Sequence, residues 1–295
     1  MRRMWCFASV ILGLCVVEPH LAAQKQQQIF VSLVAPNGTA VTDLQASDVS
    51  VTEDGVDCKI VKLEPINWPT KLQVLVDNGK ANTNPINPLR DGLKALFEQM
   101  PDGVEMSLYA TAGTPRPLVK PVIDRQKLID GIGLIAPDSG VGMFFDALSE
   151  AAGRIDKDKA SNFPVILMVA SDLGRISAPD RDFQKLQDTI LKRAVTVHVV
   201  MMGGGGGTSG GGAQTEIGLA VTKLSGGRYE NITTTNRLAT LLPEFGKTIA
   251  ESHARQSHQF RVTYERPAGA KDQPRIGAGI RREGTPMLSL DGHLP

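Results

Sequence analysis

Two aspartates each follow a long apolar stretch of the chain, and their position makes them candidates for binding chemistry. Asp77 ends the stretch that starts at Leu72, and Asp172 ends the stretch that starts at Val165. Nearly continuous apolar stretches of this length are typical of strands buried inside a parallel sheet. The carboxyl ends of such strands meet at one edge of the sheet, where open α/β folds bind ligands. We therefore expect Asp77 and Asp172 to lie at the same edge.

The elements that would position these aspartates alternate between strand and helix from Leu72 to Glu265. Apolar residues recur at helical spacing on one face of the segment between Leu89 and Met100, and comparable patterns follow the later strands. This order predicts an α/β fold, with a doubly wound, mostly parallel sheet and helices on both faces. The last strand of this series, around Val262, alternates apolar with polar residues, and we assign it to the same domain.

A small β-rich appendage precedes this domain. Residues 29–63 alternate in the manner of short strands, and Glu53-Asp54-Gly55 has the composition of a hairpin turn, with Gly55 suited to a positive φ. Beyond Pro267 the chain is polar and rich in Gly, Arg and Pro, with at most a strand near 276–280. The predicted layout is a signal peptide at 1–23, the appendage at 24–70, the main domain at 71–266 and a tail at 267–295.

The first residues have the layout of a secretory signal peptide. Arg2 and Arg3 precede an apolar segment that ends at Val17, and the small residues Ala22 and Ala23 follow. The apolar segment is short for a membrane span, so we expect cleavage after Ala23 and no stable membrane span afterwards. An uncleaved amino-terminal anchor remains the alternative. The expected location of the protein is secreted or periplasmic.

Charge and cysteine content exclude several classes of function. The chain has 32 Lys and Arg against 31 Asp and Glu, and this balance argues against nucleic acid as a partner. Two of its three cysteines lie in the predicted signal peptide, which leaves Cys58 alone. An internal disulfide and a zinc site built from paired cysteines are therefore not expected.

Several stretches of the chain resemble, in order, those of bacterial VWFA-related proteins, which are exported chains with a von Willebrand factor type A domain. Val51-x-Glu53-Asp54-Gly55 is similar to the β segment that precedes such domains. The other matching segments are Phe144-Phe145-Asp146-Ala147-Leu148, the strand that ends in Ser171-Asp172, Ser225-Gly226-Gly227-Arg228-Tyr229 and Phe260-Arg261-Val262-Thr263-Tyr264. The resemblance covers residues 29 to 266 and implies a Rossmann-like fold with loops that bind other proteins.

The resemblance also implies a metal-ion-dependent adhesion site, which this sequence carries in degenerate form. Such sites hold a divalent cation through Asp-x-Ser-x-Ser on the first loop, a Thr on the second and an Asp on the third. Here Gly79 and Ala81 replace the two serines, and Gly142 falls at the threonine position. Asp77 and Asp172 remain, with Asn78, Ser139 and Ser171 as possible neighbours. We expect Mg²⁺ or Ca²⁺ to bind weakly at most.

Other possible sites have simpler interpretations. The glycine-rich segment 203–212 matches a dinucleotide-binding spacing by composition alone, and we interpret it as a flexible linker. Cys58 has no histidine near it in the sequence, and no Gly-x-Ser-x-Gly motif is present. His198 lies inside an apolar stretch, which is typical of a core residue. His253 and His258 are five residues apart, which does not match the spacing of a zinc-binding helix.

These observations together favour an exported, non-enzymatic binding module. The expected binding rim consists of the loops at 77–88, 136–144 and 172–180, with Asp77, Asn78, Gly79, Ala81, Gly142 and Asp172 as its site residues. The expected partner is a protein or a component of the envelope or matrix. The alternative is a hydrolase or nucleotide-dependent enzyme at the same edge, which would need a pocket that joins Asp77 and Asp172 to a base such as His or Lys80.

Overall fold

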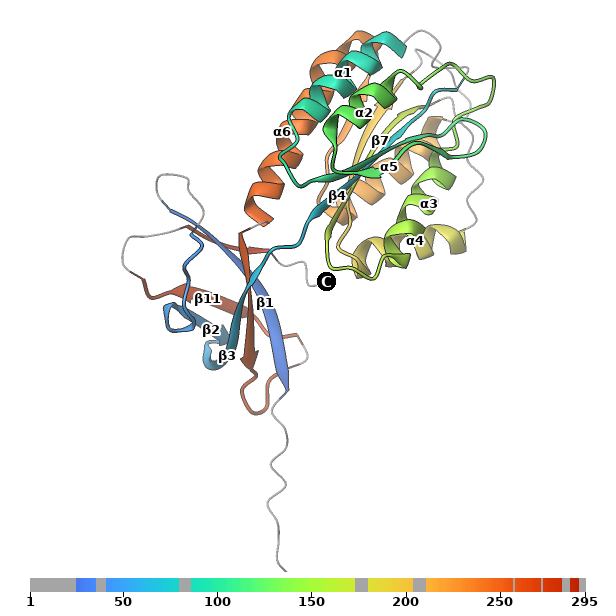
Figure 1. Ribbon diagram of the computed structural model, residues 1–295. Helices are drawn as coiled ribbons and strands as arrows, with labels where there is room; N and C mark the ends of the chain where they lie inside the picture. Colours follow the sequence, from blue (N-terminus) through green and yellow to red (C-terminus); the bar gives the residue numbers. More distant parts are fainter. Residues whose placement is uncertain are drawn as a thin grey trace, which may run out of the picture.

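A computed structural model of the chain describes residues 25–35, 41–79, 86–172, 180–203, 211–256, 258–271, 273–282 and 287–291. These residues form two six-stranded sheets, one mostly parallel and one antiparallel. Figure 1 shows the antiparallel sheet as a separate body at one end of the α/β domain. The predicted signal peptide, Ala81 and most of the glycine-rich segment lie outside the described residues.

The mostly parallel sheet has the strand order β6-β5-β4-β7-β8-β9. Only β6 runs antiparallel to its neighbour. Following the chain, β5 and β6 are added on one side of β4. The next three strands, β7, β8 and β9, are added on its other side. The order of the strands therefore reverses between β4 and β7, which makes the gap between them the topological switch point. The strands are β4 (Thr70–Val76), β5 (Glu105–Ala110), β6 (Arg116–Val122), β7 (Phe163–Ser171), β8 (Thr196–Met202) and β9 (Tyr229–Ile232).

Helices cover both faces of this sheet, as the sequence predicted (Figure 1). Alternate residues of β4 enter two hydrophobic cores, since Val74 packs in one and Leu75 in the other. The core around Val74 includes α1 (Ile86–Glu98), α2 (Arg125–Ile132) and α6 (Leu238–Gln256). The core around Leu75 includes α3 (Phe144–Lys157), α4 (Asp180–Lys192) and α5 (Gly211–Ser225). In the described part of the chain, the helices lack the combination of length and apolar character that a membrane span requires.

Two details of the predicted elements can be compared directly with the structure. The apolar stripe from Leu89 to Met100 is buried, as its helical spacing predicted. The loop predicted to extend to Pro88 ends earlier, because α1 begins at Ile86. Pro88 is accommodated in the first turn, where a missing backbone N–H breaks no helical hydrogen bond.

The antiparallel sheet combines both ends of the described chain. Its strand order is β11-β2-β3-β10-β1-β12, and it encloses a third hydrophobic core. The turn between β2 and β3 has positive φ at Asp54 (49°) and Gly55 (85°), which confirms the predicted hairpin. Its strands are β1 (Gln26–Val34), β2 (Val49–Glu53), β3 (Val56–Ile66), β10 (Gln259–Glu265), β11 (Ile276–Ile280) and β12 (Met287–Asp291).

The position of β10 corrects the assignment made from the sequence. The chain order assigns this strand to the main domain, but it pairs antiparallel with β1 and β3 in the other sheet. The physical reason is its alternating pattern. A strand with one solvent-exposed face suits an antiparallel sheet that is covered on one side. A parallel strand between two helical layers instead needs apolar residues on both faces. The tail also contributes β11, where a strand was expected, and β12, where none was.

Candidate functional site

The candidate site lies at the carboxyl-terminal edge of the parallel sheet, at the switch point. β4 and β7 are parallel neighbours with Val76 opposite Val169, so both strands end at this edge. Asp77 follows β4, and Asp172 follows β7. The structure therefore places the two predicted aspartates at the ends of adjacent strands, which is the arrangement that their sequence context indicated.

The carboxylate of Asp77 binds backbone amides of two chain segments. Its Oδ1 accepts a hydrogen bond from the N–H of Gly79 at 2.8 Å, and its Oδ2 accepts one from the N–H of Ser171 at 3.2 Å. The backbone N–H of Asp77 donates to the carbonyl of Val169 at 2.8 Å. With only 2% of its surface exposed, Asp77 links the loop after β4 to the end of β7 from a buried position.

Asn78 holds the neighbouring loop, residues 133–143, against the sheet edge. Its Nδ2 donates to the carbonyl of Ala136 at 2.8 Å, and its Oδ1 accepts from the N–H of Ala112 at 3.3 Å. Its backbone carbonyl also accepts from the N–H of Asp138 at 2.8 Å. Because the Asn78 side chain is buried and its amide is bound at both ends, it fixes the loop in one position.

Gly79 and Gly142 allow the backbone to pack directly against Asp77. A Cβ atom on Gly142 would lie 2.2 Å from Oδ2 of Asp77, far inside van der Waals contact. A Cβ on Gly79 would lie 2.8 Å from the carbonyl oxygen of Gly140 and 3.0 Å from Oδ1 of Asp77. The missing hydroxyl side chains are therefore not replaced by open space, because backbone of the 133–143 loop lies close to the carboxylate.

Asp172 lies toward the other side of the switch point. Its backbone N–H donates to the carbonyl of Met202 at the end of β8 at 3.1 Å. Its Oδ2 is 3.7 Å from the position that a Cβ on Gly203 would occupy, and Oδ1 of Asn231 is 3.2 Å from the same position. The Asp172 carboxylate therefore lies near the ends of β8 and β9, whereas the Asp77 carboxylate lies against Gly142.

This arrangement does not fit the divalent cation that the fold implies. Both carboxylate oxygens of Asp77 accept backbone N–H groups, and Gly142 provides no hydroxyl. A hard cation takes about six oxygen ligands in a defined geometry, some of them water, and the hydroxyl ligands expected at positions 79 and 142 are replaced by glycine here. Ala81, the remaining predicted rim residue, lies outside the described residues.

The structure adds rim residues that the sequence analysis did not select. Leu134 and Val141 lie on the loop held by Asn78, and their exposed fractions are 58% and 48%. Asp138 on the same loop accepts from the N–H of Gly140 at 2.8 Å and pairs with Arg116 at 3.5 Å. Apolar residues within a segment rich in Gly, Pro and Asp are the sequence signal that could have identified them.

The fold and the location of the site define a doubly wound α/β domain whose switch point is closed by its own loops. No protein-family model and no curated protein matches the sequence. A solved von Willebrand factor type A protein from Catenulispora acidiphila is similar in structure, with a TM-score of 0.52 and 11% sequence identity over 91% of this chain and 72% of that chain.

A second similar structure is the pilus adhesin SpaC from Lactobacillus rhamnosus GG in its open conformation. Its TM-score is 0.51 and its sequence identity 10%, over 82% of this chain and 47% of the adhesin. At such low identity the similarity concerns the fold. The α/β domain has the von Willebrand factor type A fold, as the ordered sequence motifs predicted.

Proposed function

We propose that this chain is an exported binding module that contacts another protein through the carboxyl-terminal rim of its α/β domain, without a tightly bound metal ion. The observation that carries this proposal is the 133–143 loop. Hydrogen bonds to Asn78 fix the loop over the switch point, while the apolar side chains of Leu134 and Val141 are exposed. Exposed apolar side chains on a rigid loop are well suited to bury surface against a partner.

The surroundings of Asp77 support binding without a metal ion. In a metal-dependent adhesion site, a carboxylate of the partner completes the shell of the cation. Here the Asp77 carboxylate accepts two backbone N–H groups and organises the loops themselves. The rim would then recognise its partner by shape and apolar contact, and binding would tolerate chelators.

The positions of the potential catalytic groups support a non-enzymatic role. His198 and Thr70, the hydrogen-bond partner of His253, line a cavity that includes residues near the start of β4 and β7, at the opposite edge from Asp77. Cys58 lies on β3 in the other sheet, and burial raises the pKa of its thiol, which disfavours the reactive thiolate. These histidines and this cysteine therefore lie away from the two aspartates of the rim, and Lys80, the other candidate base, lies outside the described residues.

Photo-crosslinking tests this proposal. A photoreactive amino acid at position 141 of the full chain should capture a partner in the producing cells, and the same amino acid at position 219 should not. Leu219 is a matched control because it is exposed by 48%, as Val141 is, but lies on α5. The captured protein is then purified, and its affinity for the unmodified chain is measured.

The affinity measurement decides the outcome. Val141→Asp should weaken binding by about tenfold or more, because it places a charge in an apolar contact. Leu219→Asp and addition of EDTA should leave the affinity unchanged. The proposal fails if Val141→Asp binds as tightly as the unmodified chain, or if EDTA abolishes binding.

A further inference from the structure

A cavity of about 300 Å³ lies between the two sheets, at the amino-terminal edge of the parallel sheet. Phe30 and Gln259 line it from the antiparallel sheet, and Thr70, Val165 and His198 line it from the parallel sheet. Side chains of α6 complete its wall. Its volume is at the lower end of the range of about 300–1,000 Å³ that is typical of small-molecule sites. The cavity is distinct from the rim, which is at the opposite edge of the sheet.

Three aromatic rings form a continuous apolar wall of this cavity. The ring of Trp68 lies 5.9 Å from that of Phe30 in an edge-to-face arrangement and 5.5 Å from that of Phe163. Trp68 is in the connection between β3 and β4, so these contacts join the two sheets. Such a wall suits a flat apolar or aromatic ligand.

The charged groups that line the cavity are all cationic. Arg193 and Arg255 contribute guanidinium groups, and the lining includes no Asp or Glu. Arg255 donates to the hydroxyl of Ser252 at 2.9 Å. Within the described part of the chain, neither arginine forms an ion pair with a carboxylate. Hydrogen bonds from lysines, and then the charge of Arg193, lower the pKa of the Asp156 and Asp158 carboxyl groups, which lie outside the lining and offset part of its charge. The lining itself carries net positive charge.

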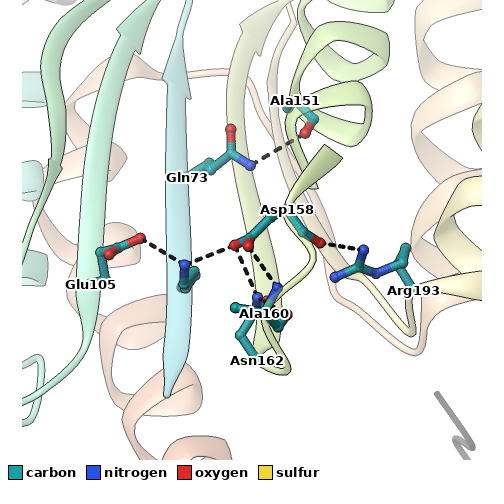
Figure 2. A network of polar contacts seen from close by, with 8 residues as sticks. Gln73, Glu105, Ala151, Asp158, Ala160, Asn162 and Arg193 are labelled. Carbon is teal, nitrogen blue, oxygen red and sulfur yellow. Dashed lines mark hydrogen bonds and ion pairs between the residues drawn. The ribbon is translucent and has the colours of Figure 1, made fainter. Parts of the chain in front are cut away.

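Figure 2 shows how Arg193 contacts the backbone of Asp158 while the Asp158 carboxylate binds other groups. The guanidinium of Arg193 donates to the backbone carbonyl of Asp158 at 2.6 Å. The carboxylate of Asp158 instead binds Lys71 at 2.8 Å, the N–H of Ala160 at 2.9 Å and the amide of Asn162 at 3.1 Å. The hydrogen bond from Lys71 keeps the pKa of Asp158 below its usual value, so this carboxylate stays ionised and paired with lysine.

His198 is a neutral polar residue of the cavity lining. Only 5% of the accessible surface of His198 is exposed. Burial, followed by the nearby charge of Arg228, lowers its pKa to about 4, so the ring is neutral at pH 7. Nδ1 accepts the backbone N–H of Arg228 at 3.0 Å, which places the ring proton on Nε2. Nε2 has no hydrogen-bond partner among the described residues.

From this arrangement we propose that the cavity is a binding site for a small organic anion with a flat, apolar body, such as an aromatic carboxylate. The body would lie against Trp68, and the anionic group would accept hydrogen bonds from Arg193 or Arg255. Guanidinium groups bind carboxylates in a forked geometry that neutral amides do not match. Because the lining comes from both sheets, the ligand would also hold the two bodies together.

Fluorescence of Trp68 tests this proposal, because the chain contains only one other tryptophan, Trp5. The full chain with Trp5→Phe is titrated with 4-nitrobenzoate, which quenches tryptophan emission, and with the neutral analogue 4-nitrobenzamide. We expect saturable quenching by the acid at one site and binding of the amide that is weaker by about tenfold or more. Calorimetry with the same compounds checks the stoichiometry.

Variants separate charge recognition from apolar partition. Arg193→Gln and Arg255→Gln should weaken 4-nitrobenzoate binding, by about tenfold for the arginine that holds the anion. Arg275→Gln is the matched control, since Arg275 is exposed and outside the cavity lining, and it should leave the affinity unchanged. Thr248→Phe, which adds a ring to the lining from α6, should abolish binding without lowering the unfolding temperature.

Three results would overturn the proposal. The first is quenching that does not saturate. The second is equal binding of the acid and the amide, which would indicate apolar partition only. The third is an affinity that neither arginine substitution reduces more than Arg275→Gln does. Circular dichroism spectra of every variant confirm that the fold is intact before binding is compared.

Discussion

The backbone of Gly142 lies directly against the carboxylate of Asp77. A Cβ on residue 142 would be 2.2 Å from Oδ2 and 2.4 Å from Cγ of the aspartate. Asp77 also binds the N–H groups of Gly79 and Ser171. The aspartate that would begin a metal site in related folds is thus a structural centre around which two loops pack.

The first prediction concerns restoration of the missing threonine. Gly142→Thr should lower the free energy of unfolding by about 1–3 kcal/mol, because the new side chain must displace the loop from Asp77. Urea unfolding is measured with and without Mg²⁺. Gly153→Thr is the matched control, since a Cβ at Gly153 in α3 meets nothing within 4 Å. A Gly142→Thr protein that is as stable as the unmodified chain, or that Mg²⁺ stabilises strongly, would contradict the packing described.

The second prediction concerns Asp77 itself. Asp77→Ala should cost about 2–4 kcal/mol in the free energy of unfolding, because it leaves the buried N–H groups of Gly79 and Ser171 without their acceptor. Chemical denaturation in the presence and absence of EDTA should give the same loss. Asp91→Ala, on the exposed face of α1, should have little effect. A loss that disappears once EDTA is present would show that metal binding, and not loop packing, is the role of Asp77.

Three of the parallel strands, β4, β7 and β8, could be predicted because each is marked by a nearly continuous apolar run. Leu72–Val76 and the run that starts at Val165 predicted two neighbouring strands and hence the edge where Asp77 and Asp172 lie. The position of β10 was missed because assignment in chain order treats consecutive strands as neighbours. The alternation around Val262 carried the correct information, since it indicates a strand with one exposed face.

The residue types at the rim could be predicted, but their packing could not. The sequence showed that hydroxyl groups are missing at Gly79 and Gly142, and this predicts weak metal binding by loss of ligands. It could not show that the 133–143 loop would fill the space, because that depends on the side-chain hydrogen bonds of Asn78 to Ala112 and Ala136. Contacts between residues that are distant in the sequence leave no local pattern to read.

The third prediction is a pH dependence of stability that arises from His198. In the folded state its pKa is about 4, whereas an unfolded histidine has a pKa of about 6.5. The unfolded state therefore binds more protons between these values, and the free energy of unfolding falls as the pH decreases from about 6.5 to 4. The loss from this group amounts to about 3 kcal/mol.

His198→Asn isolates this contribution. The amide oxygen of asparagine can accept the N–H of Arg228 in place of Nδ1, and it does not titrate. Denaturant unfolding measured at several pH values should show a smaller decrease for the variant than for the unmodified chain. His253→Gln is the comparison variant for the pH dependence. Burial also lowers the pKa of His253, but His253 is more exposed than His198. Equal pH dependence of His198→Asn and the unmodified chain would refute the assignment.

The fourth prediction concerns a buried ion pair that joins β2 to the residue after β10. Arg266 Nε donates to Glu53 at 3.0 and 3.1 Å, and the hydroxyl of Tyr264 donates to Glu53 at 2.8 Å. The exposed fractions of the Glu53 and Arg266 side chains are 1% and 15%. Burial, followed by the hydrogen bond to Glu53, raises the pKa of Tyr264, which therefore remains a donor at neutral pH.

Glu53→Leu or Arg266→Leu alone should cost about 3–5 kcal/mol, because each leaves one buried charge without its partner. The double variant should lose less than the two single losses together, since no unpaired charge remains. A double-mutant cycle by urea unfolding measures this coupling. Lys59→Ala is the control. Lys59 pairs with Glu265 and so joins β3 to β10, but its side chain is 75% exposed. We expect this substitution to change the free energy of unfolding little. Additive losses would mean that Glu53 and Arg266 do not stabilise one another, and that β10 is held in the antiparallel sheet by its strand pairing and by hydrophobic packing.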